Sequence, residues 1–229
     1  MQKKKPRAVL LTDSLGCPRD EIAVDSMWTD QILSEFGDRI TFYSSCIYGL
    51  SAKDIPKDYI RYLEPDLVIC QIGIVDACRR ALTVKEEKRI SKIPVFRRLI
   101  KGVCSKKHYA ITRIRNKHRA NMREFSDALD SLIDIANIKI AFLEIAPPGD
   151  FLVGKTYNVK EDITQYNKIL DEKEVMKKVD IIRPFSRSSI LDCNEYILKA
   201  DGHHLNIQGN SMVYEAVRDY LLQFLNAYK

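Results

Sequence analysis

Five short apolar segments recur along the 229-residue chain, and each ends where polar residues begin. They are nearly continuous rather than alternating, which is typical of strands buried on both faces of a sheet. Amphipathic patterns typical of helices separate them. The expected strands are 7–12, 40–45, 66–72, 138–145 and 179–184, and the expected helices are 21–36, 51–63, 119–136, 160–177 and 208–226. This alternation predicts an α/β fold with a five-stranded parallel sheet, right-handed crossovers and helices on both faces.

The size of the chain favours a single domain over residues 1–229, because 45% hydrophobic residues suffice for one substantial core but not for two. No apolar run approaches the roughly 20 residues that span a bilayer. The first apolar stretch ends after four residues at Thr12, so the N-terminus lacks the apolar core of a signal peptide and we expect a cytoplasmic protein. The scattered cysteines contain no Cys-x-x-Cys pair, which predicts free thiols, several of them buried.

Positive charge is concentrated in one stretch. Residues 79–119 contain fifteen Lys and Arg against two Glu, a net charge of +13, whereas the whole chain is +6 and the remainder therefore −7. The stretch is too long for an ordinary loop and contains no strand pattern. We predict a basic insertion or lid at about 79–118, after the third strand, with some helix near 94–104.

Three interpretations of this insertion stay open. It could be a solvated face, a lid or surface that contacts an anionic membrane or a lipid-linked substrate, or a nucleic-acid site. Aliphatic residues interleave with the cations, which favours the second interpretation. Aromatic residues are few and no nucleic-acid recognition motif is present, so the third is the least favoured.

Ligands of open α/β sheets bind at the carboxyl ends of the strands, and Ser14 follows the first predicted strand in the sequence TDSLG. A serine hydroxyl becomes a nucleophile when a base takes its proton and a third group orients that base. The segment DGHHLN near the C-terminus can supply both, since a turn would bring Asp201 and His204 together. Asn206 is predicted to be the N-cap of the last helix, and His203 would point elsewhere.

In these blocks the sequence resembles the SGNH (GDSL-type) hydrolases. Ser14 in TDSLG, Gly49 in IYGLS and the DGHHL block follow the family's order, and the basic insertion alone falls outside the resemblance. The resemblance implies a flavodoxin-like three-layer α/β/α sandwich. It also implies that Ser14 is the nucleophile, His204 the general base and acid, and Asp201 the orienting carboxylate. The backbone N–H groups of Ser14 and Gly49 would form part of the oxyanion hole.

Two positions depart from the family's pattern. Thr12 stands where a glycine usually precedes Asp-Ser, and Val75 in the block GIVD stands where the family's Asn donates a third oxyanion hydrogen bond. Losing one such donor typically costs a factor of about 10²–10³ in rate, or about 3–4 kcal/mol. Asp76 in the same block is expected to be structural and to tie the loop near Ser14. The candidates for a substitute donor or a substrate contact are Gln71, Arg79, Arg80 and His203.

The resemblance implies a serine esterase that hydrolyses O-acyl esters, in particular O-acetyl esters, through an acyl-Ser14 intermediate. The phrase QIGIVDACRR also resembles a subset of the family found among bacterial capsule and O-antigen biosynthesis proteins, so the expected substrate is an O-acylated saccharide or polysaccharide precursor. No cofactor or metal is expected, because the acids and histidines lack metal-ligand spacing. An O-acyltransferase with the same triad is an open alternative. A catalytically degenerate glycan- or membrane-binding protein is another, and Val75 favours it.

Overall fold

The computed structural model describes residues 4–92, 100, 102–135, 137–177, 179–186, 188–190 and 192–228. Its centre is a five-stranded sheet in the order β2-β1-β3-β4-β5, and every neighbouring pair is parallel. The strands are β1 Arg7–Thr12, β2 Thr41–Cys46, β3 Leu67–Gln71, β4 Lys139–Leu143 and β5 Asp180–Ile182. This is the flavodoxin-like order of a doubly wound fold, as the sequence predicted.

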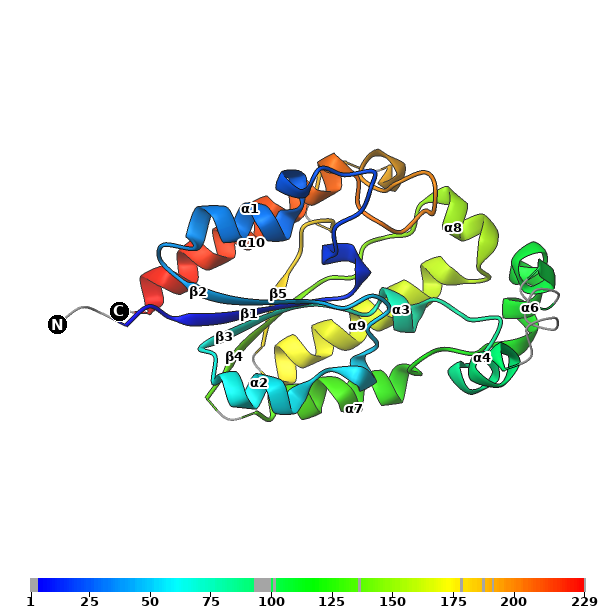
Figure 1. Cartoon of the computed structure of the whole chain (residues 1–229), viewed down its shortest axis with the longest axis horizontal. Coiled ribbons are helices and arrows are strands. Elements are labelled where there is room, and N and C mark those ends of the chain that lie inside the picture. Colours follow the sequence, from blue (N-terminus) through cyan, green and yellow to red (C-terminus); the bar gives the residue numbers. More distant parts are fainter. Residues whose placement is uncertain are drawn as a thin grey trace.

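Helices cover both faces of the sheet (Figure 1), which gives three layers. The helices of the first face are α1 Trp28–Phe36 and α10 Ile207–Ala227, and those of the other are α2 Lys57–Leu63, α7 Met122–Ile133 and α9 Val159–Lys177. Further helices of the described residues lie beyond the carboxyl ends of the strands, among them α3 Ile74–Ala77, α4 Val84–Ser91, α6 His108–Arg115 and α8 Asp150–Lys155. Short 3-10 turns are η1 Ser14–Gly16, η2 Val24–Ser26, η3 Ala52–Asp54 and η4 Cys193–Glu195.

The central strands are apolar on both sides because each side faces a helical layer. In β1, Ala8 and Leu10 join the core under α1 and α10, whereas Val9 and Leu11 join the core under α2, α7 and α9. All four residues are essentially inaccessible to solvent. Successive side chains of a strand point to opposite faces, so a strand between two layers needs a continuous apolar run.

The ends of several elements differ from the prediction. The helix expected at 21–36 begins only at Trp28, after the short turn η2. The helix expected at 51–63 is divided into η3 and α2, because Pro56 lies between them and has no N–H to donate. Most of the helix expected near 94–104 lies outside the described residues.

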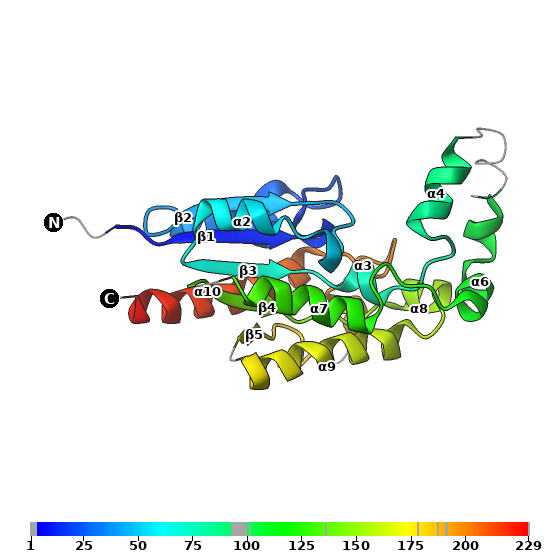
Figure 2. The same ribbon diagram turned by 90° about the horizontal axis from the view of Figure 1, so that it is seen from below.

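Within the described part of the basic insertion the chain forms α4 and α6 and no strand, in agreement with the absence of a strand pattern. Figure 2 shows both helices standing away from the layered body, at the end opposite to the two chain termini.

All six cysteines are free thiols, and Cys17 and Cys70 are buried. None of the helices in the described ranges is both long and apolar enough to cross a membrane.

We predict that Phe125→Ala lowers the free energy of unfolding by about 3–5 kcal/mol, since it leaves a cavity in the core. Phe125 is fully buried, and its ring centroid lies 5.0 Å from that of Tyr166. Urea unfolding measures the change. The control is Met122→Ala on the same helix, where the side chain is 39% exposed and the loss should be below about 1 kcal/mol. Equal losses in the two variants would contradict this account of the core.

Candidate active site

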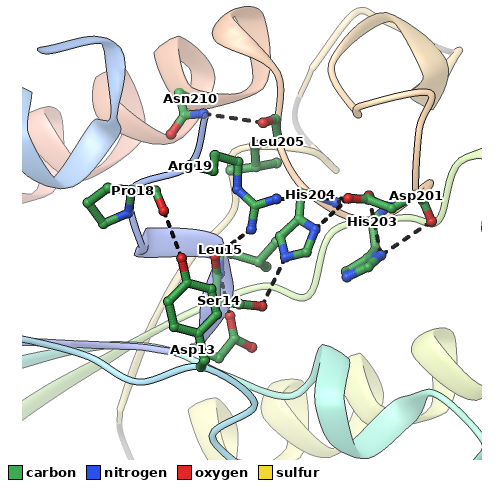
Figure 3. Close-up of polar contacts among 11 residues, drawn as sticks. Asp13, Ser14, Leu15, Pro18, Arg19, Asp201, His203, His204, Leu205 and Asn210 are labelled. Atoms are coloured by element: carbon green, nitrogen blue, oxygen red, sulfur yellow. Dashed lines mark hydrogen bonds and ion pairs between the residues drawn. The ribbon is translucent and has the colours of Figure 1, made fainter. Parts of the chain in front are cut away.

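Ser14 lies in a tight turn directly after β1, where it begins η1 (Figure 3). The turn starts because the Asp13 carboxylate accepts a hydrogen bond of 2.9 Å from the Leu15 N–H. Gly16 is needed because a Cβ at this position would lie 2.4 Å from the Thr12 hydroxyl oxygen. The chain therefore folds back over the end of its own strand and holds Ser14 half-buried at the carboxyl edge of the sheet.

The loop that carries Asp201 and His204 is held by two helices. Gly202 accepts a hydrogen bond of 2.7 Å from the Gly149 N–H at the start of α8. Its φ is +73°, and a Cβ there would lie 2.4 Å from the backbone nitrogen of Leu152, so only glycine fits. At the other end of the loop the Asn206 side chain accepts from the third N–H of α10, at 3.0 Å, which confirms its prediction as the N-cap.

The structure brings Ser14, His204 and Asp201 together. The distance from His204 Nε2 to Ser14 Oγ is 3.0 Å, and that from His204 Nδ1 to Asp201 Oδ2 is 2.7 Å. The second carboxylate oxygen, Asp201 Oδ1, accepts the backbone N–H groups of His203 and His204, both at 3.0 Å. The carboxylate thus orients the ring, and the ring can accept the serine proton.

Electrostatics keep Asp201 ionised. Burial alone would raise the pKa of Asp201, but hydrogen bonds from the His204 ring and from the backbone N–H groups of His204 and His203 hold that pKa well below its usual value. The carboxylate is therefore an anion at every pH at which an imidazole can act as a base. The fixed negative charge of the Asp201 carboxylate, beside His204 Nδ1, stabilises the imidazolium that forms when Nε2 takes a proton.

His203 lies beside His204 and does not reach Ser14 (Figure 3). The centroids of the two rings are 3.9 Å apart, and His203 Nδ1 lies 3.3 Å from the backbone oxygen of Asp201. Burial, together with the neighbouring His204, lowers the pKa of His203 to about 4, which makes this ring neutral at pH 7. His203 therefore packs against His204, the proposed base, and does not contact Ser14.

Arg19 joins the two halves of the site, and no feature of the sequence indicated it. Its Nη2 donates to the backbone oxygen of Ser14 at 3.2 Å, and its Nη1 lies 3.8 Å from Asp201 Oδ2. The side chain is only 13% exposed. Its position depends on how the loop after η1 turns back toward the last helix, which no local pattern shows.

The proposed oxyanion donors have free N–H groups. Within the described residues, neither the Ser14 N–H nor the Gly49 N–H donates a hydrogen bond to the protein. Gly49 follows β2 with a φ of +67°, a conformation that favours glycine. Val75 packs against the core and offers no donor. The Gln71 side chain is buried and its Oε1 accepts the Trp28 indole N–H at 3.1 Å, which leaves the Gln71 amide N–H groups available.

The other two candidate donors make their contacts elsewhere. Arg79 binds Asp162 of α9 with two hydrogen bonds of 2.6 and 3.0 Å, which holds the start of the insertion against the body. The Arg80 N–H donates to the backbone oxygen of Lys117, and its side chain lines a cavity of about 460 Å³ in the insertion. The Arg79 guanidinium is thus held by an ion pair with Asp162. The prediction that Arg79 and Arg80 are substitute oxyanion donors or substrate contacts stays a prediction, since the bond of Arg80 to Lys117 involves only its backbone.

Asp76 is structural, as expected. Its carboxylate accepts the Ser51 hydroxyl at 2.5 Å and the N–H groups of Ala52 and Ala120 at 2.8 and 3.1 Å. These bonds tie the loop after β2 and the end of the insertion to the loop after β3. Asp76 thereby fixes the segment that carries Gly49.

Asp201, His203 and His204 also form a group whose ligand-type atoms all lie within 4.8 Å of one another, which the spacing along the sequence did not suggest. The fit to a metal ion is poor, however. Asp201 Oδ2 and His204 Nδ1 already share a hydrogen bond of 2.7 Å, and His204 Nε2 faces Ser14. A metal ion bound here would have to replace the contact that orients the base.

Comparison with solved structures identifies proteins of the same fold. A lipase/acylhydrolase from Enterococcus faecalis has a TM-score of 0.65 and 14% identity, over 93% of each chain. An acetylxylan esterase from Geobacillus stearothermophilus has a TM-score of 0.61 and 13% identity, over 95% of this chain and 94% of the other. A carbohydrate acetylesterase from Sinorhizobium meliloti has a TM-score of 0.59 and 13% identity, over 96% of this chain and 100% of the other.

A member of the lipolytic G-D-S-L family from Veillonella parvula also matches, with a TM-score of 0.60, 10% identity and coverage of 93% of this chain and 96% of that one. No protein-family model matches the sequence, and no curated protein matches it. The chain therefore has the α/β/α fold of the SGNH (GDSL-type) hydrolases, which confirms the fold that the resemblance predicted.

We predict that Asp13→Asn stabilises the protein at alkaline pH. Burial raises the pKa of Asp13 from 3.8 to about 7, against a hydrogen bond from Leu15 and with a smaller contribution from Asp76. The unfolded chain loses this proton near pH 4 and the folded chain only near pH 7, so stability falls as the pH rises between these values. Asparagine cannot ionise. The free energy of unfolding of Asp13→Asn should equal that of the parent below pH 4 and exceed it by on the order of 2–4 kcal/mol above pH 8.

Urea unfolding of the parent and of Asp13→Asn across this pH range measures the gain. The control is Asp20→Asn, which removes an exposed carboxylate of the same loop and should change stability little at any pH. A constant difference between Asp13→Asn and the parent from pH 4 to pH 8 would show that Asp13 is not held protonated by its burial.

Proposed function

We propose that the chain is a serine esterase that removes O-acyl groups, in particular O-acetyl groups, through an acyl-Ser14 intermediate. The observation that carries this proposal is the 3.0 Å contact between Ser14 Oγ and His204 Nε2, with Asp201 on the other ring nitrogen. A hydroxyl, a base and an orienting carboxylate in this order are what acyl transfer requires. The shared fold with a lipase/acylhydrolase and with acetylesterases supports the same reaction class.

In the first half of the reaction, Ser14 Oγ attacks the acyl carbonyl carbon while His204 Nε2 takes the hydroxyl proton. The carbonyl oxygen becomes an oxyanion, for which the N–H groups of Ser14 and Gly49 are the proposed donors. The bond to the leaving alcohol then breaks, and His204 returns the proton to that alcohol. The product is the acyl-Ser14 ester and a free hydroxyl on the former substrate.

In the second half, water replaces the alcohol. His204 takes a proton from the water, whose oxygen attacks the acyl carbonyl carbon. The bond to Ser14 Oγ breaks, the serine regains its proton from His204, and the carboxylic acid leaves. Asp201 stays ionised throughout and stabilises the imidazolium in both halves.

Gln71 is the proposed third oxyanion donor in place of the residue at position 75. Gln71 ends β3, and its backbone oxygen accepts the Asp13 N–H at 3.0 Å, which anchors it beside the nucleophile turn. Its side-chain oxygen is held by Trp28, so the amide N–H groups have a defined direction. The alternative of a degenerate, non-catalytic protein rests mainly on Val75, which cannot donate a hydrogen bond to the oxyanion. A donor at Gln71 would remove that argument.

For the substrate we propose an O-acetylated saccharide or polysaccharide precursor. Two of the proteins that share the fold are described as an acetylxylan esterase and as a carbohydrate acetylesterase, which supports this class. The loop resemblance to capsule and O-antigen biosynthesis proteins points in the same direction. A small acyl group and a large alcohol also suit a nucleophile that lies half-buried at the edge of the sheet.

We predict that Ser14→Ala lowers the release of acetate from p-nitrophenyl acetate and from acetylated oligosaccharides by at least about 10³-fold, since it removes the nucleophile. A fluorophosphonate probe should label Ser14 in the parent and leave the variant unlabelled. The control is His203→Ala, which should stay within about fivefold of the parent because His203 contacts the base but not the serine. Equal losses in the two variants would contradict the choice of His204 as base, and an unlabelled parent would refute the esterase.

We predict that Arg19→Gln lowers kcat by about tenfold, with a smaller effect on KM, because Arg19 positions the Ser14 backbone and Asp201 rather than the substrate. Arg19→Lys keeps the charge and a donor and should recover part of the lost kcat. A parent-like kcat in Arg19→Gln would show that the arginine does not position Ser14 and Asp201.

A further inference from the structure

Most of the positive charge in the described part of the insertion has no carboxylate partner. Three arginines have carboxylate partners, in the pairs Arg79–Asp162, Arg115–Glu86 and Arg119–Asp54. Within the described residues, no carboxylate lies within ion-pair distance of the remaining cations, which are Arg80, Lys85, Lys88, Arg89, Lys92, Lys106, Lys107, Arg113 and Lys117. Like charges gathered on one unit repel one another. A surface of this kind therefore fits an anionic partner.

Large apolar side chains are exposed among these cations. Ile114 is 84% exposed, Val103 49% and Tyr109 44%. The opposite side of α6 faces the protein, since Thr112 is buried and its hydroxyl accepts the Tyr157 N–H at 3.2 Å. The exposed side of residues 102–117 thus mixes aliphatic groups with the cations Lys106, Lys107, Arg113 and Lys117.

The insertion lies at the same end of the molecule as the candidate active site. Figures 1 and 2 place α4 and α6 beyond the carboxyl ends of the strands and far from both chain termini. Ser14 begins η1 directly after the carboxyl end of β1. The insertion is fastened to α8, because His108 Nδ1 lies 3.0 Å from the backbone oxygen of Lys155. The other end of α8 holds Gly202, beside Asp201 and His204. A surface that bound the insertion would therefore face the active-site end.

We propose that the exposed side of residues 102–117 docks the protein on an anionic lipid surface, with the active-site end toward that surface. This proposal goes beyond the esterase and does not depend on it. Each Lys or Arg near such a surface strengthens partitioning roughly fivefold, and aliphatic side chains add to binding when they enter the interface. The aliphatic groups favour lipid over nucleic acid. The exposed Ile114 and Val103 can enter a bilayer interface, whereas nucleic acid is held mainly by hydrogen bonds to phosphate and sugar.

The test is co-sedimentation of the full chain with vesicles of phosphatidylcholine, alone or mixed with phosphatidylglycerol. The parent should bind the mixed vesicles and should not bind the neutral vesicles. Added salt, which shortens the Debye length toward about 3 Å, should release the parent from the mixed vesicles. The triple variant Lys106→Glu, Lys107→Glu, Arg113→Glu should bind at least about 100-fold more weakly. Ile114→Ser should weaken binding by a smaller factor and leave its salt dependence unchanged.

The matched control is Lys4→Glu, Lys5→Glu, Lys168→Glu, which changes the net charge equally at exposed positions away from the insertion. It should bind like the parent. If both triple variants lost vesicle binding equally, net charge alone would explain the binding, and the proposal of a specific docking surface would be overturned. Equal binding to neutral vesicles, or binding of duplex or single-stranded oligonucleotides without binding of vesicles, would also overturn the proposal.

Activity measurements separate this proposal from the esterase. Ser14→Ala should bind mixed vesicles as the parent does, although it lacks activity. The triple variant of the insertion should hydrolyse p-nitrophenyl acetate in free solution at the parent rate, because none of its three positions touches the site. An inactive parent that still binds vesicles would refute the esterase alone, and an active parent that does not bind would refute the docking surface alone.

Discussion

A single hydrogen bond between His204 and Ser14 joins positions that are 190 residues apart, and the rest of the site depends on it. It can form because all five strands run in the same direction, so that the loop after the first strand and the loop before the last helix reach the same edge. The turn of Ser14 is fixed by the Asp13 cap, and the loop of His204 is fixed by Gly202 and Asn206. The distance is therefore a property of the whole fold.

Three carboxylates at this edge, of which Asp13 and Asp76 are buried and Asp201 is partly exposed, play different roles. Asp201 is ionised by its hydrogen bonds and orients the base, whereas Asp76 joins three loops by accepting three donors. Asp13 caps the nucleophile turn with one oxygen, while its other oxygen is buried and has no hydrogen-bond partner among the described residues. Burial without a second partner is what raises the pKa of Asp13. Burial also raises the pKa of Asp76 despite its three donors, so the balance between burial and hydrogen bonds differs from one carboxylate to the next.

The basic insertion is attached to this frame at defined points. Arg79 holds its start against Asp162, and Ala120 holds its end against Asp76. His108 fastens its outer helix to α8, and α8 in turn supports the loop of Asp201. Its position relative to the site is thus set by contacts that do not involve the unpaired cations, which stay available to a partner.

The pattern of apolar runs located the strands. For the inner strands the reason is that both faces lie under helices and must be apolar, whereas the edge strand β2 is only partly buried. Helix starts were less predictable. The segment before Trp28 has no strong N-cap and forms a loop instead, and Pro56 divides a pattern that looked continuous. Ser14, Asp201 and His204 were predicted as one site because the sequence blocks that contain them follow the order seen in the SGNH hydrolases. Arg19 was missed and the pairing of Arg79 with Asp162 was not predicted, since the partner of a long cationic side chain depends on segments far apart in the sequence.

The sequence by itself determined the layers, the strand positions, the N-cap at Asn206 and the two segments that carry the candidate triad, since these follow from local periodicity and from residues close together in the chain. The tertiary structure alone decided the separation of Ser14 and His204, the ionisation of Asp13 and Asp201, and the bridge made by Arg19. Distances and pKa values depend on packing between segments far apart in the chain, which no local pattern encodes.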